Sequence, residues 1–416
     1  MVSKWTEHLL GDVIELKRGF DLPQSQRRQG NIPIVSSSGV SGTHSEPRVA
    51  GPGVVTGRYG TLGQVFFVPG DFWPLNTTLF VSDFKGNDPK FVSYFLRTLD
   101  FLSYSDKAAV PGVNRNHLHT AKIFWPPDVE EQRAVAHILG TLDDKIELNR
   151  KMNQTLEAIA QAIFKSWFVD FDPVRAKASG ESAQSICRRL GITAELLALF
   201  PARFQGSELG EIPEGWDVSE VGDVVTIVGG STPSTKSSEY WDGGTIHWAT
   251  PKDFSSLSSR VLLDTERKIT DLGLRQISSG LLPPGTVLMS SRAPIGYLAL
   301  STIPISVNQG FIAMVCDGPI SSYYMLHWCE RNLDRIKQRA GGTTFAEISK
   351  GAFRPMPLAV PKKALLGQFD AIVKPIFTLV AERARESTTL VKLRDSLLPK
   401  LVSGELPLSS VEGKNL

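Results

Sequence analysis

The sequence predicts an α+β protein in which two tandem globular modules are joined by two long antiparallel helices that pair as a coiled coil. Three observations lead to this fold class. Long apolar stripes with helical spacing run through residues 130–168 and again through residues 363–402, and a set of landmarks recurs in the same order before each of them. At 416 residues, with 41% hydrophobic and 21% charged residues, the chain is long enough for several ordinary globular domains.

These observations divide the chain into six expected segments. The expected segments are a first module over 1–128, a long helix over 129–169, a linker with short helices over 170–209, a second module over 210–361, a C-terminal long helix over 362–404 and a tail over 405–416.

The first long helix is expected over Glu130–Phe168, where apolar side chains recur every three or four residues. At about 1.5 Å per residue this helix is roughly 60 Å long, well beyond an ordinary globular helix. Read as heptads, the stripe places Asn149 on one seam position and Asn153 on the other. A stripe so long and narrow requires a partner helix.

The partner is expected within the same chain, over Lys363–Val402, which carries a similar stripe. Pro375 is expected to kink or break this helix near its first third. Periodicity alone leaves open the alternative of two unrelated amphipathic surface helices. The internal repeat favours the coiled coil.

The repeat consists of six landmarks that occur in the same order in both halves of the chain, as a duplication of a module plus a helix would produce. The paired positions include Trp5 with Trp216, Arg58 with Arg292, Gly63 with Gly296, Asn76 with Asn308, Trp125-Pro126 with Val360-Pro361, and Gln132 with Gln368. The segment VNRNHL (113–118) likewise matches ISKGAF (348–353). The repeat predicts two modules related by a pseudo-two-fold axis.

Within each module, short apolar stretches separated by Gly, Pro, Ser and Asn predict strands and turns. The expected strands are 13–16, 54–56, 65–68 and 79–82 in the first module and 224–228, 287–289, 297–301 and 311–315 in the second, with helices near 89–102 and 321–339. Between the modules we expect a small and polar linker, DFDPVRAKASGESAQ (170–184), then one or two short helices, then an extended stretch over 206–216.

Composition bounds the environment of the protein. The three cysteines are widely spaced without metal-ligand spacing, which favours free thiols in a reducing compartment. The first residues lack a signal-peptide pattern, and no uninterrupted apolar run approaches the length of a membrane span. We therefore expect a cytoplasmic protein without a membrane partner. A formal net charge of +2 neither requires nor excludes a polyanionic partner.

No catalytic constellation is evident in the sequence. There is no Gly-rich phosphate loop ending in Lys-Ser/Thr, and the seven His are scattered. The Asn/Asp-Pro-Pro-aromatic element with which amino-methyltransferases hold an exocyclic amine is also missing. We expect no catalytic residue, no metal site and no cofactor in this chain.

The loops of both modules do carry side chains suited to DNA, because Arg, Asn, Gln, Ser and Thr read base edges while Lys and Arg neutralise phosphates. The alternative for each residue is that it is simply a solvated loop residue, and this is weakest for Arg58 and Arg292, which recur in both modules. The candidate DNA-binding residues are Lys17, Arg18, Arg27, Arg28, Arg58, Tyr59, Asn76, Asn114, Arg115, Asn116, Thr232, Lys236, Lys252, Arg292, Asn308, Gln309, Thr343, Thr344 and Lys350.

The whole chain resembles the specificity (S) subunit of Type I restriction–modification enzymes. The resemblance lies in the layout of two modules and two long helices and in three junction motifs: SWFVDFDPVRAK (166–177), LLALFPARFQGSELGEIPEGW (196–216) and SLLPKLVSGEL (396–406). It implies that each module reads one half of a split double-stranded DNA site, and that the coiled coil sets the spacer and docks methyltransferase subunits. It implies no catalytic residue in this chain.

The same resemblance implies partners and cofactors outside the chain. Two methyltransferase (M) subunits would bind S-adenosylmethionine and methylate adenine N6, and restriction (R) subunits would use ATP and Mg²⁺. A rigid helical pair suits a split site, since two readers must be held at a fixed separation on a duplex that repeats every ~34 Å. The alternative from another class is a coiled-coil scaffold with two protein-binding modules and no DNA role.

Overall fold

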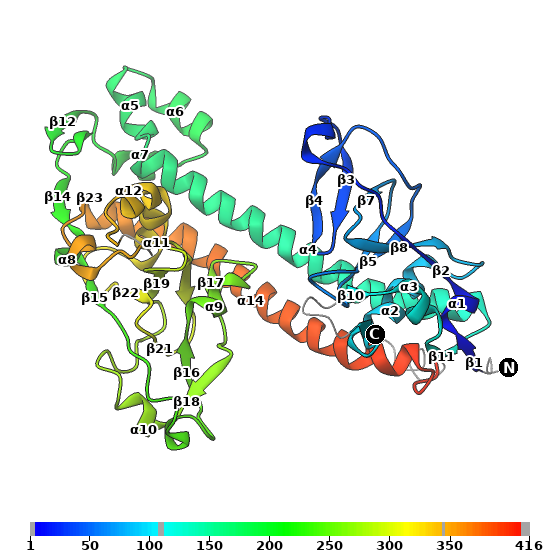
Figure 1. The fold of residues 1–416 in the computed structure, drawn as a ribbon. Helices are drawn as coiled ribbons and strands as arrows, with labels where there is room; N and C mark the ends of the chain where they lie inside the picture. The colour runs from blue at the N-terminus through cyan, green and yellow to red at the C-terminus, as the bar shows by residue number, and fades with distance from the viewer. Residues whose placement is uncertain (1–4, 107–111, 343–345, 409–416) are drawn as a thin grey trace. The chain divides into compact units, whose positions relative to one another are not determined.

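The computed structural model describes residues 5–106, 112–342 and 346–408 and is drawn in Figure 1. Contacts between residues divide the chain into two compact units. Unit 1 comprises Met1–Ile146 with Thr389–Leu416, and unit 2 comprises Glu147–Thr388. Each unit contains one globular module, named module 1 (residues 5–128) and module 2 (residues 210–361), together with parts of both long helices.

Module 1 is organised around a four-stranded sheet in the order β2-β8-β5-β6 and a three-stranded sheet in the order β4-β3-β7. Its strands are β1 (Thr6–Leu9), β2 (Glu15–Arg18), β3 (Ile32–Ser36), β4 (Gly39–His44), β5 (Gly53–Gly57), β6 (Val65–Val68), β7 (Trp73–Pro74), β8 (Thr78–Asp83), β9 (Ser105–Asp106), β10 (Gly112–Val113) and β11 (Lys122–Trp125). Its helical segments are α1 (Leu10–Val13), η1 (Gln24–Gln26), α2 (Pro89–Thr98), η2 (Phe101–Tyr104) and α3 (Arg115–His119).

Local sequence explains how α2 is set on the core of module 1. The Asp88 side chain accepts a hydrogen bond from the N–H of Phe91, and Pro89 occupies the first turn, where its missing N–H costs nothing. Phe91 and Phe95 of the helix then pack edge-on against the ring of Trp125. The helix is therefore fixed at both its start and its buried face.

Module 2 is built on a five-stranded sheet in the order β15-β22-β19-β20-β17 and a three-stranded sheet in the order β18-β16-β21. Its strands, with those of a preceding hairpin, are β12 (Phe204–Ser207), β13 (Gly210–Pro213), β14 (Asp217–Glu220), β15 (Thr226–Val228), β16 (Ile246–Ala249), β17 (Val261–Leu262), β18 (Arg267–Ile269), β19 (Val287–Ser290), β20 (Leu298–Ser301), β21 (Ser306–Val307), β22 (Phe311–Val315) and β23 (Pro357–Val360). Its helical segments are α8 (Val221–Val224), η3 (Ser238–Tyr240), α9 (Pro251–Ser255), α10 (Asp271–Leu274), α11 (Ser322–Arg331), α12 (Leu333–Gln338) and α13 (Lys350–Phe353).

The two modules share one topology, which confirms the duplication inferred from sequence. In both, the strand after the first short helix pairs with the last long strand, so that β2-β8-β5-β6 corresponds to β15-β22-β19-β20. The first and last strands also pair antiparallel in each module, as β1 with β11 and as β14 with β23. A parallel pair, β3-β7 or β16-β21, holds the smaller sheet.

The long helices are α4 (Val129–Phe168) and α14 (Lys363–Val402), each 40 residues long, at the bounds that the sequence predicts. In unit 2 the amide of Asn149 donates to Glu386 and Ser387, the amide of Asn153 donates to the carbonyl of Val380, and Phe164 packs on Phe369. The partner number falls as the α4 number rises, so the helices run antiparallel. Both asparagines are buried on the seam.

In unit 1 the two helices share an apolar core that includes Val135 and Leu401, and an ionic contact also joins them to α2. Arg394 of α14 donates to the Asp143 carboxylate of α4 at 2.7 Å, and Tyr94 of α2 donates to the same carboxylate at 2.7 Å. Burial opposes ionisation of Asp143, but hydrogen bonds from Arg394 and Tyr94 and the charge of Arg97 outweigh it and lower the pKa of the carboxyl. Asp143 therefore remains charged and ties α2 to both long helices.

The structure differs from the sequence-based expectations in three respects. α14 is continuous through Pro375, so the expected break is absent. The linker expected over 170–184 contains a helix, α5 (Asp172–Ala178), because Pro173 occupies its first turn and Val174 is buried. The first predicted strand of each module is shifted, since Val13 ends α1 and β2 begins at Glu15, while Val224 ends α8 and β15 begins at Thr226. Two further short helices, α6 (Ala183–Leu190) and α7 (Ala194–Ala198), follow as expected.

One long helix has the length of a membrane span. Within the described residues, helix Lys363–Val402 is long and apolar enough to cross a membrane by length and composition alone, although Asp370 and Lys374 interrupt its apolar residues. Its apolar residues Phe369, Val373 and Val380 belong to the buried core of unit 2. The core helix of a globular protein passes the same test, so this finding is weak evidence for a membrane.

Candidate nucleic-acid interface

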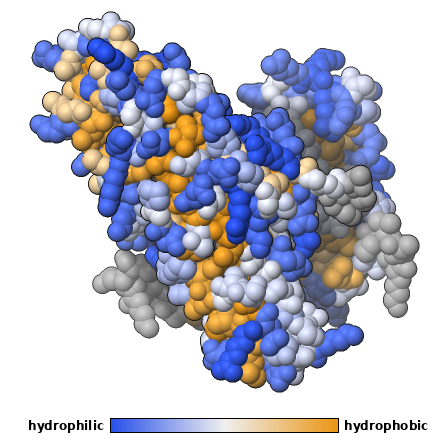
Figure 2. Space-filling model, turned by 90° about the vertical axis from the view of Figure 1, so that its left-hand side faces the viewer, coloured by the Kyte–Doolittle hydropathy of each residue, from blue (hydrophilic) through white to orange (hydrophobic). Residues whose placement is uncertain are grey.

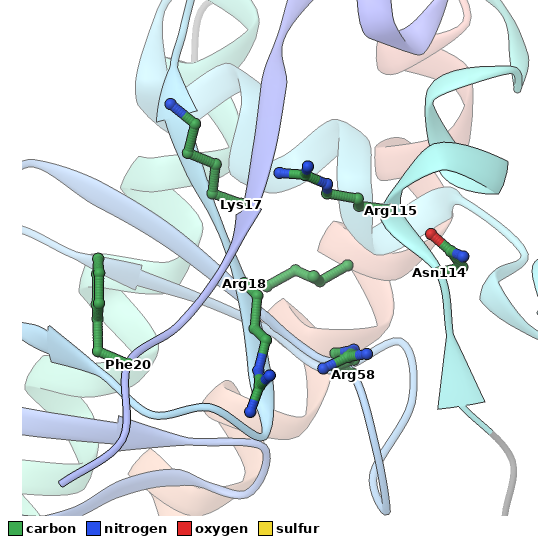
Figure 3. A pocket seen from close by; sticks show the side chains of 7 residues that line it. Lys17, Arg18, Phe20, Arg58, Asn114 and Arg115 are labelled. Atoms are coloured by element: carbon green, nitrogen blue, oxygen red, sulfur yellow. The ribbon is translucent and has the colours of Figure 1, made fainter.

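An open, basic cavity of about 440 Å³ lies on module 1 (Figure 3). Its lining side chains come from β2 and the following loop, from the residue after β5, from β8, and from the start of α3. The lining residues are Lys17, Arg18, Phe20, Arg58, Leu79, Asn114 and Arg115. Five of these seven were predicted from sequence to contact DNA, and the fold brings them together from three distant segments of the chain.

Backbone contacts hold Arg58 at the centre of this cavity. Its N–H donates to the carbonyl of Thr77 at 2.9 Å, and its carbonyl accepts from Val113 at 3.0 Å. The guanidinium stacks on the ring of Tyr59, with Cζ 4.7 Å from the ring centre. A Cβ at Gly112 would lie 2.3 Å from that ring, so a larger residue on β10 would displace Tyr59 from its present position. Arg58 is thereby oriented before any ligand arrives.

The cations of the cavity are weakly neutralised. Lys17 lies 3.4 Å from Glu15 and Arg18 lies 3.9 Å from Asp21, and both pairs are largely exposed to solvent. Within the described part of the chain, no ion pair involves Arg58 or Arg115. Two of the four cations that line the cavity thus have exposed carboxylates beside them, and Arg58 and Arg115 have none among the described residues, so the lining keeps an excess of positive charge. Such a surface attracts a polyanion.

A histidine fixes the strand that presents two of these cations. The N–H of Leu16 on β2 donates to Nε2 of His119 at 3.0 Å. Burial, followed by the charge of Arg115, lowers the pKa of His119. The neutral imidazole can therefore accept this hydrogen bond at pH 7, which keeps β2 and α3 together beneath the cavity.

The start of α3 and a second stacked arginine complete the rim. The Asn114 side chain caps α3 by accepting from the N–H of Asn116 at 3.0 Å, which leaves Arg115 projecting from the first turn. Sequence analysis missed Phe20 and Arg48: the Arg48 guanidinium lies 4.8 Å from the centre of the Phe20 ring. Phe20 and Arg48 are too far apart in the sequence for a helical or strand periodicity to relate them.

Besides Tyr59, whose ring contacts Arg58, four predicted residues of module 1 do not line the cavity. Arg28 pairs with Glu46 at 3.2 Å, and Arg27 donates to the carbonyl of Leu22 at 3.4 Å. The Asn76 amide donates to the Asp21 carboxylate, and Asn116 is an exposed residue of α3. Arg28, Arg27 and Asn76 thus have local structural partners, and a DNA role for all four residues stays a prediction.

Module 2 carries less free charge at the equivalent positions. Arg292, the counterpart of Arg58, lies 3.7 Å from the carboxylate of Glu347 and also bridges to it through the backbone. Lys350, the counterpart of Arg115, extends beside Gly229, where a Cβ would lie 3.1 Å from Nζ. Val228 and Gly229 stand where module 1 has Lys17 and Arg18.

The other described residues predicted in module 2 are neutral or paired, except Lys236. Thr232 donates to the side chain of Gln309 at 2.6 Å, and Asn308 accepts from the N–H of Gly310 at 2.8 Å within a turn. Lys252 pairs with Glu266 at 2.8 Å, whereas Lys236 is exposed on a loop. Thr343 and Thr344 lie outside the described residues. Module 2 therefore presents amide and hydroxyl groups more than charge.

A second cavity, of about 460 Å³, occurs in unit 2 and has a different character. Figure 2 views the molecule from the side on which β12 and β14 lie, where apolar side chains are exposed among hydrophilic ones. Phe164, Phe168 and Phe171 contribute to the cavity wall, and its two arginines are offset by Glu211 and Asp334. Without an excess of positive charge, it is poorly suited to a polyanion.

Comparison with known proteins gives the family. The sequence profile described as "Type I restriction modification DNA specificity domain" matches residues 2–158 and 213–371, one match for each module. The chain belongs to this family of DNA specificity subunits. The wider fold of the specificity chain agrees, since it superposes on the crystal structure of a Type I restriction–modification S subunit from M. genitalium with a TM-score of 0.58 at 16% identity, covering 96% of each chain.

Two curated relatives of the specificity chain are more similar in sequence. It is 34% identical over 192 residues to the Type I restriction enzyme MjaIX specificity subunit of Methanocaldococcus jannaschii, covering 46% of this chain and 44% of the relative. It is 30% identical over 317 residues to the Type I restriction enzyme HindI specificity subunit of Haemophilus influenzae, covering 67% of this chain and 68% of the relative. The first match thus spans less than half of that relative.

The basic cavity of the specificity chain offers hydrogen-bond donors and positive charge. Among the described residues, no group of three or more His, Cys, Asp or Glu could hold a metal ion. Burial raises the pKa of the Cys316 thiol to about 12 and raises that of Cys329 well above its ordinary value, so both remain protonated. The exposed chemistry consists of hydrogen-bond donors and positive charge, which suits recognition.

Proposed function

We propose that this specificity chain binds double-stranded DNA at a bipartite, asymmetric site, with each module reading one half. The observation that carries this proposal is the basic cavity of module 1 together with the recurrence of its central arginine, Arg58, as Arg292 in module 2. Positive charge supplies affinity for phosphates, and Arg, Asn and Gln side chains distinguish base edges in the major groove.

The paired helices are assigned two roles in this proposal. Both α4 and α14 continue without a break from residues of one compact unit to residues of the other. A helical pair with buried, hydrogen-bonded asparagines has a defined register and is stiffer than a flexible linker. We expect it to set the spacer between the half-sites and to dock two methyltransferase subunits.

Catalysis is assigned to partners. S-adenosylmethionine is expected on the methyltransferase subunits, and ATP and Mg²⁺ on restriction subunits, with the complex in the cytoplasm. The adenine to be methylated must leave the base stack to reach an active site on a partner. The specificity chain contributes recognition, and the unneutralised cations of module 1 favour DNA over a purely protein-binding scaffold role.

Methylome sequencing of cells that contain this chain and its cognate methyltransferase tests the proposal. A methylated motif made of two short conserved halves separated by a fixed number of unspecified base pairs is expected. A continuous motif, or none with an active methyltransferase, would contradict the bipartite reading. Binding to the selected duplex should also fall steeply with salt, because phosphate contacts release counterions.

Matched insertions test the spacer role. Asn149 of α4 lies opposite Ser387 of α14, so a four-residue insertion after Asn149 is combined with one after Glu386. Four residues add ~6 Å of helix and form a stutter that nearly preserves the seam. At 3.4 Å per base pair, the gap should lengthen by one or two base pairs while both half-site sequences stay the same.

Single insertions are the control for this design. An insertion in α4 alone displaces Asn153 from the carbonyl of Val380 without a compensating shift in α14, and it should lower both stability and methylation. A double insertion that changes a half-site sequence but leaves the gap unchanged would overturn the spacer role.

A further inference from the structure

An exposed arginine of module 2, Arg267, is held flat on an indole ring. Its guanidinium carbon lies 3.5 Å from the ring centre of Trp241 and 5.5 Å from that of Trp248. The two tryptophans meet edge to face, with ring centres 5.0 Å apart. Arg267 begins β18 and is paired in register with Trp248 on β16, so the sheet itself places the side chain over the two rings.

Hydrogen bonds fix the two indoles to the loop that follows β15. The Trp248 indole N–H donates to the carbonyl of Ser231 at 3.2 Å, and the Trp241 indole N–H donates to the carbonyl of Ser234 at 3.0 Å. Gly230 also lies against β21, where a Cβ would meet the carbonyl oxygen of Val307 at 1.6 Å. The loop and the aromatic rings therefore form one rigid surface.

This surface is continuous with predicted DNA-binding residues. Thr232 and Lys236 lie on the same loop, and Thr232 donates to Gln309 in the turn that follows β21. Among the described residues, no carboxylate forms an ion pair with Arg267, which is exposed to solvent. Its positive charge is available to a ligand.

Stacking leaves the recognition edge of the guanidinium unobstructed. The N–H groups of arginine lie in the guanidinium plane, whereas the tryptophan contacts its face. A guanidinium whose plane is already set loses little conformational entropy when it donates two parallel hydrogen bonds. Guanine presents two adjacent acceptors, O6 and N7, in the major groove, and an arginine fork matches them.

We propose that Arg267 reads a guanine in the half-site bound by module 2. The inference rests on the proposed DNA-binding function and adds a specificity-determining residue to it. Module 1 contains a related arrangement, with Arg48 stacked on Phe20 beside the basic cavity. Stacked arginines thus occur next to the predicted recognition residues in both modules.

The experiment uses the full chain assembled with its methyltransferase subunits and a library of duplexes with randomised positions. The selected wild-type site defines the two half-sites, and each position is then substituted in turn. Arg267→Ala should weaken binding to the wild-type site by about 5- to 100-fold. The preference for guanine should be lost at one position of the module 2 half-site, while every other position and the whole module 1 half-site keep their preferences.

Two further variants separate readout from charge and from folding. Arg267→Lys keeps the charge but removes the planar fork, so it should relax the same position. Lys268→Ala removes a positive charge from the neighbouring residue, whose side chain pairs with Asp264 at 3.5 Å and, by strand alternation, lies on the other face. It should leave the selected site unchanged. Tryptophan fluorescence and thermal unfolding of each variant report whether the stacked surface remains folded.

The outcomes distinguish this inference from the proposed function. If the wild-type complex selects no bipartite site, the proposed function fails. If it selects one but folded Arg267→Ala selects the same site with the same preference, Arg267 does not read DNA. An even loss of affinity over all sequences, with a smaller salt dependence, would make Arg267 a phosphate contact and overturn the guanine assignment.

Discussion

Modules 1 and 2 share the strand order of their sheets but present different chemistry at equivalent positions. Module 1 places Lys17, Arg18, Arg58 and Arg115 around one cavity. The corresponding region of module 2 has Val228 and Gly229 on its strand, and its arginine lies beside Glu347. The backbone topology fixes where recognition residues stand, and substitutions on that backbone decide whether they act by charge or by hydrogen bonding.

The contacts between each module and the long helices also differ, since they are ionic in unit 1 and aromatic in unit 2. In unit 1 the joint is the ionised Asp143, which accepts hydrogen bonds from Tyr94 and Arg394. In unit 2 it is aromatic packing of Phe164 on Tyr324 of α11, together with Glu157, which accepts from the N–H of Arg260 and whose pKa is raised by burial. The folded protein therefore favours the charged form of Asp143 and the neutral form of Glu157.

The largest expected effect comes from removing the ionic joint. Asp143→Ala should lower the free energy of unfolding of unit 1 by about 2–4 kcal/mol, because Arg394 and Tyr94 lose a half-buried partner. The folded-state pKa of Asp143 is lowered, so its contribution is present above the ordinary pKa of 3.8 and is lost as pH falls through the folded value. Urea unfolding at pH 7 and pH 3 measures both effects.

A neighbouring residue provides the control for that measurement. Asp144 is exposed and pairs with Lys90 at 3.9 Å, so Asp144→Ala should change stability little. Equal losses for the two variants would mean that Asp143 is not a specific joint between α2 and the long helices.

The next effect compares the two recurrent arginines. Arg58→Ala should weaken binding to the selected site by about 1–3 kcal/mol if the side chain reads a base. Arg292→Ala should cost less, because its ion pair with Glu347 already satisfies part of its charge. Fluorescence anisotropy with one duplex at several salt concentrations measures both. A larger loss for Arg292→Ala would contradict the idea that module 1 acts mainly by charge and module 2 mainly by neutral hydrogen bonds.

A smaller effect is expected from relieving that ion pair. Glu347→Gln removes the negative charge beside Arg292, so DNA affinity should rise by up to about 1 kcal/mol and its salt dependence should steepen. Glu181→Gln, which breaks the Arg189 pair in the helical segment between the modules, serves as the control and should leave affinity unchanged. Unchanged affinity in Glu347→Gln as well would place Arg292 away from the DNA.

The smallest expected effect is a gain in stability, in contrast to the loss expected for Asp143→Ala. Glu157→Gln keeps an acceptor for the N–H of Arg260. It removes a carboxyl group whose pKa is raised by burial. For such a carboxyl, stability falls as pH rises from the ordinary value of 4.5 through the folded value. The variant should therefore be slightly more stable than the wild type at pH 7 and equal to it below pH 4. A loss of stability at pH 7 would show that ionised Glu157 stabilises its contacts with Arg260.

Periodic features were predictable from the sequence, and contacts between distant residues were not. The bounds of α4 and α14 and the strand at Val65–Val68 follow from apolar spacing, and the repeat identified Arg58 with Arg292 as equivalent positions. The helix at Asp172–Ala178 was missed because its composition is that of a linker, and burial of Val174 against tertiary neighbours determines its structure.

The site was predictable only in part, for the same physical reason. Residue type indicated which side chains could contact DNA, but partners brought close by the fold show that Lys252 and Asn308 are engaged locally. Conversely, Arg267 gave no signal, since the tryptophans on which it stacks are far from it in the sequence. Pairings of this kind depend on strand register, which the sequence alone leaves open.

The composition of unit 1 has a consequence for the order in which the protein can fold during its synthesis. Leu401 and Val402, close to the end of α14, belong to the same core as Val135 and Leu139 of α4. The module made first therefore stays incomplete on the ribosome until almost the whole chain has emerged, and until then its half of α4 has an uncovered apolar stripe. Nascent chains that stop at residue 388 would leave this stripe as a target for chaperones or proteases.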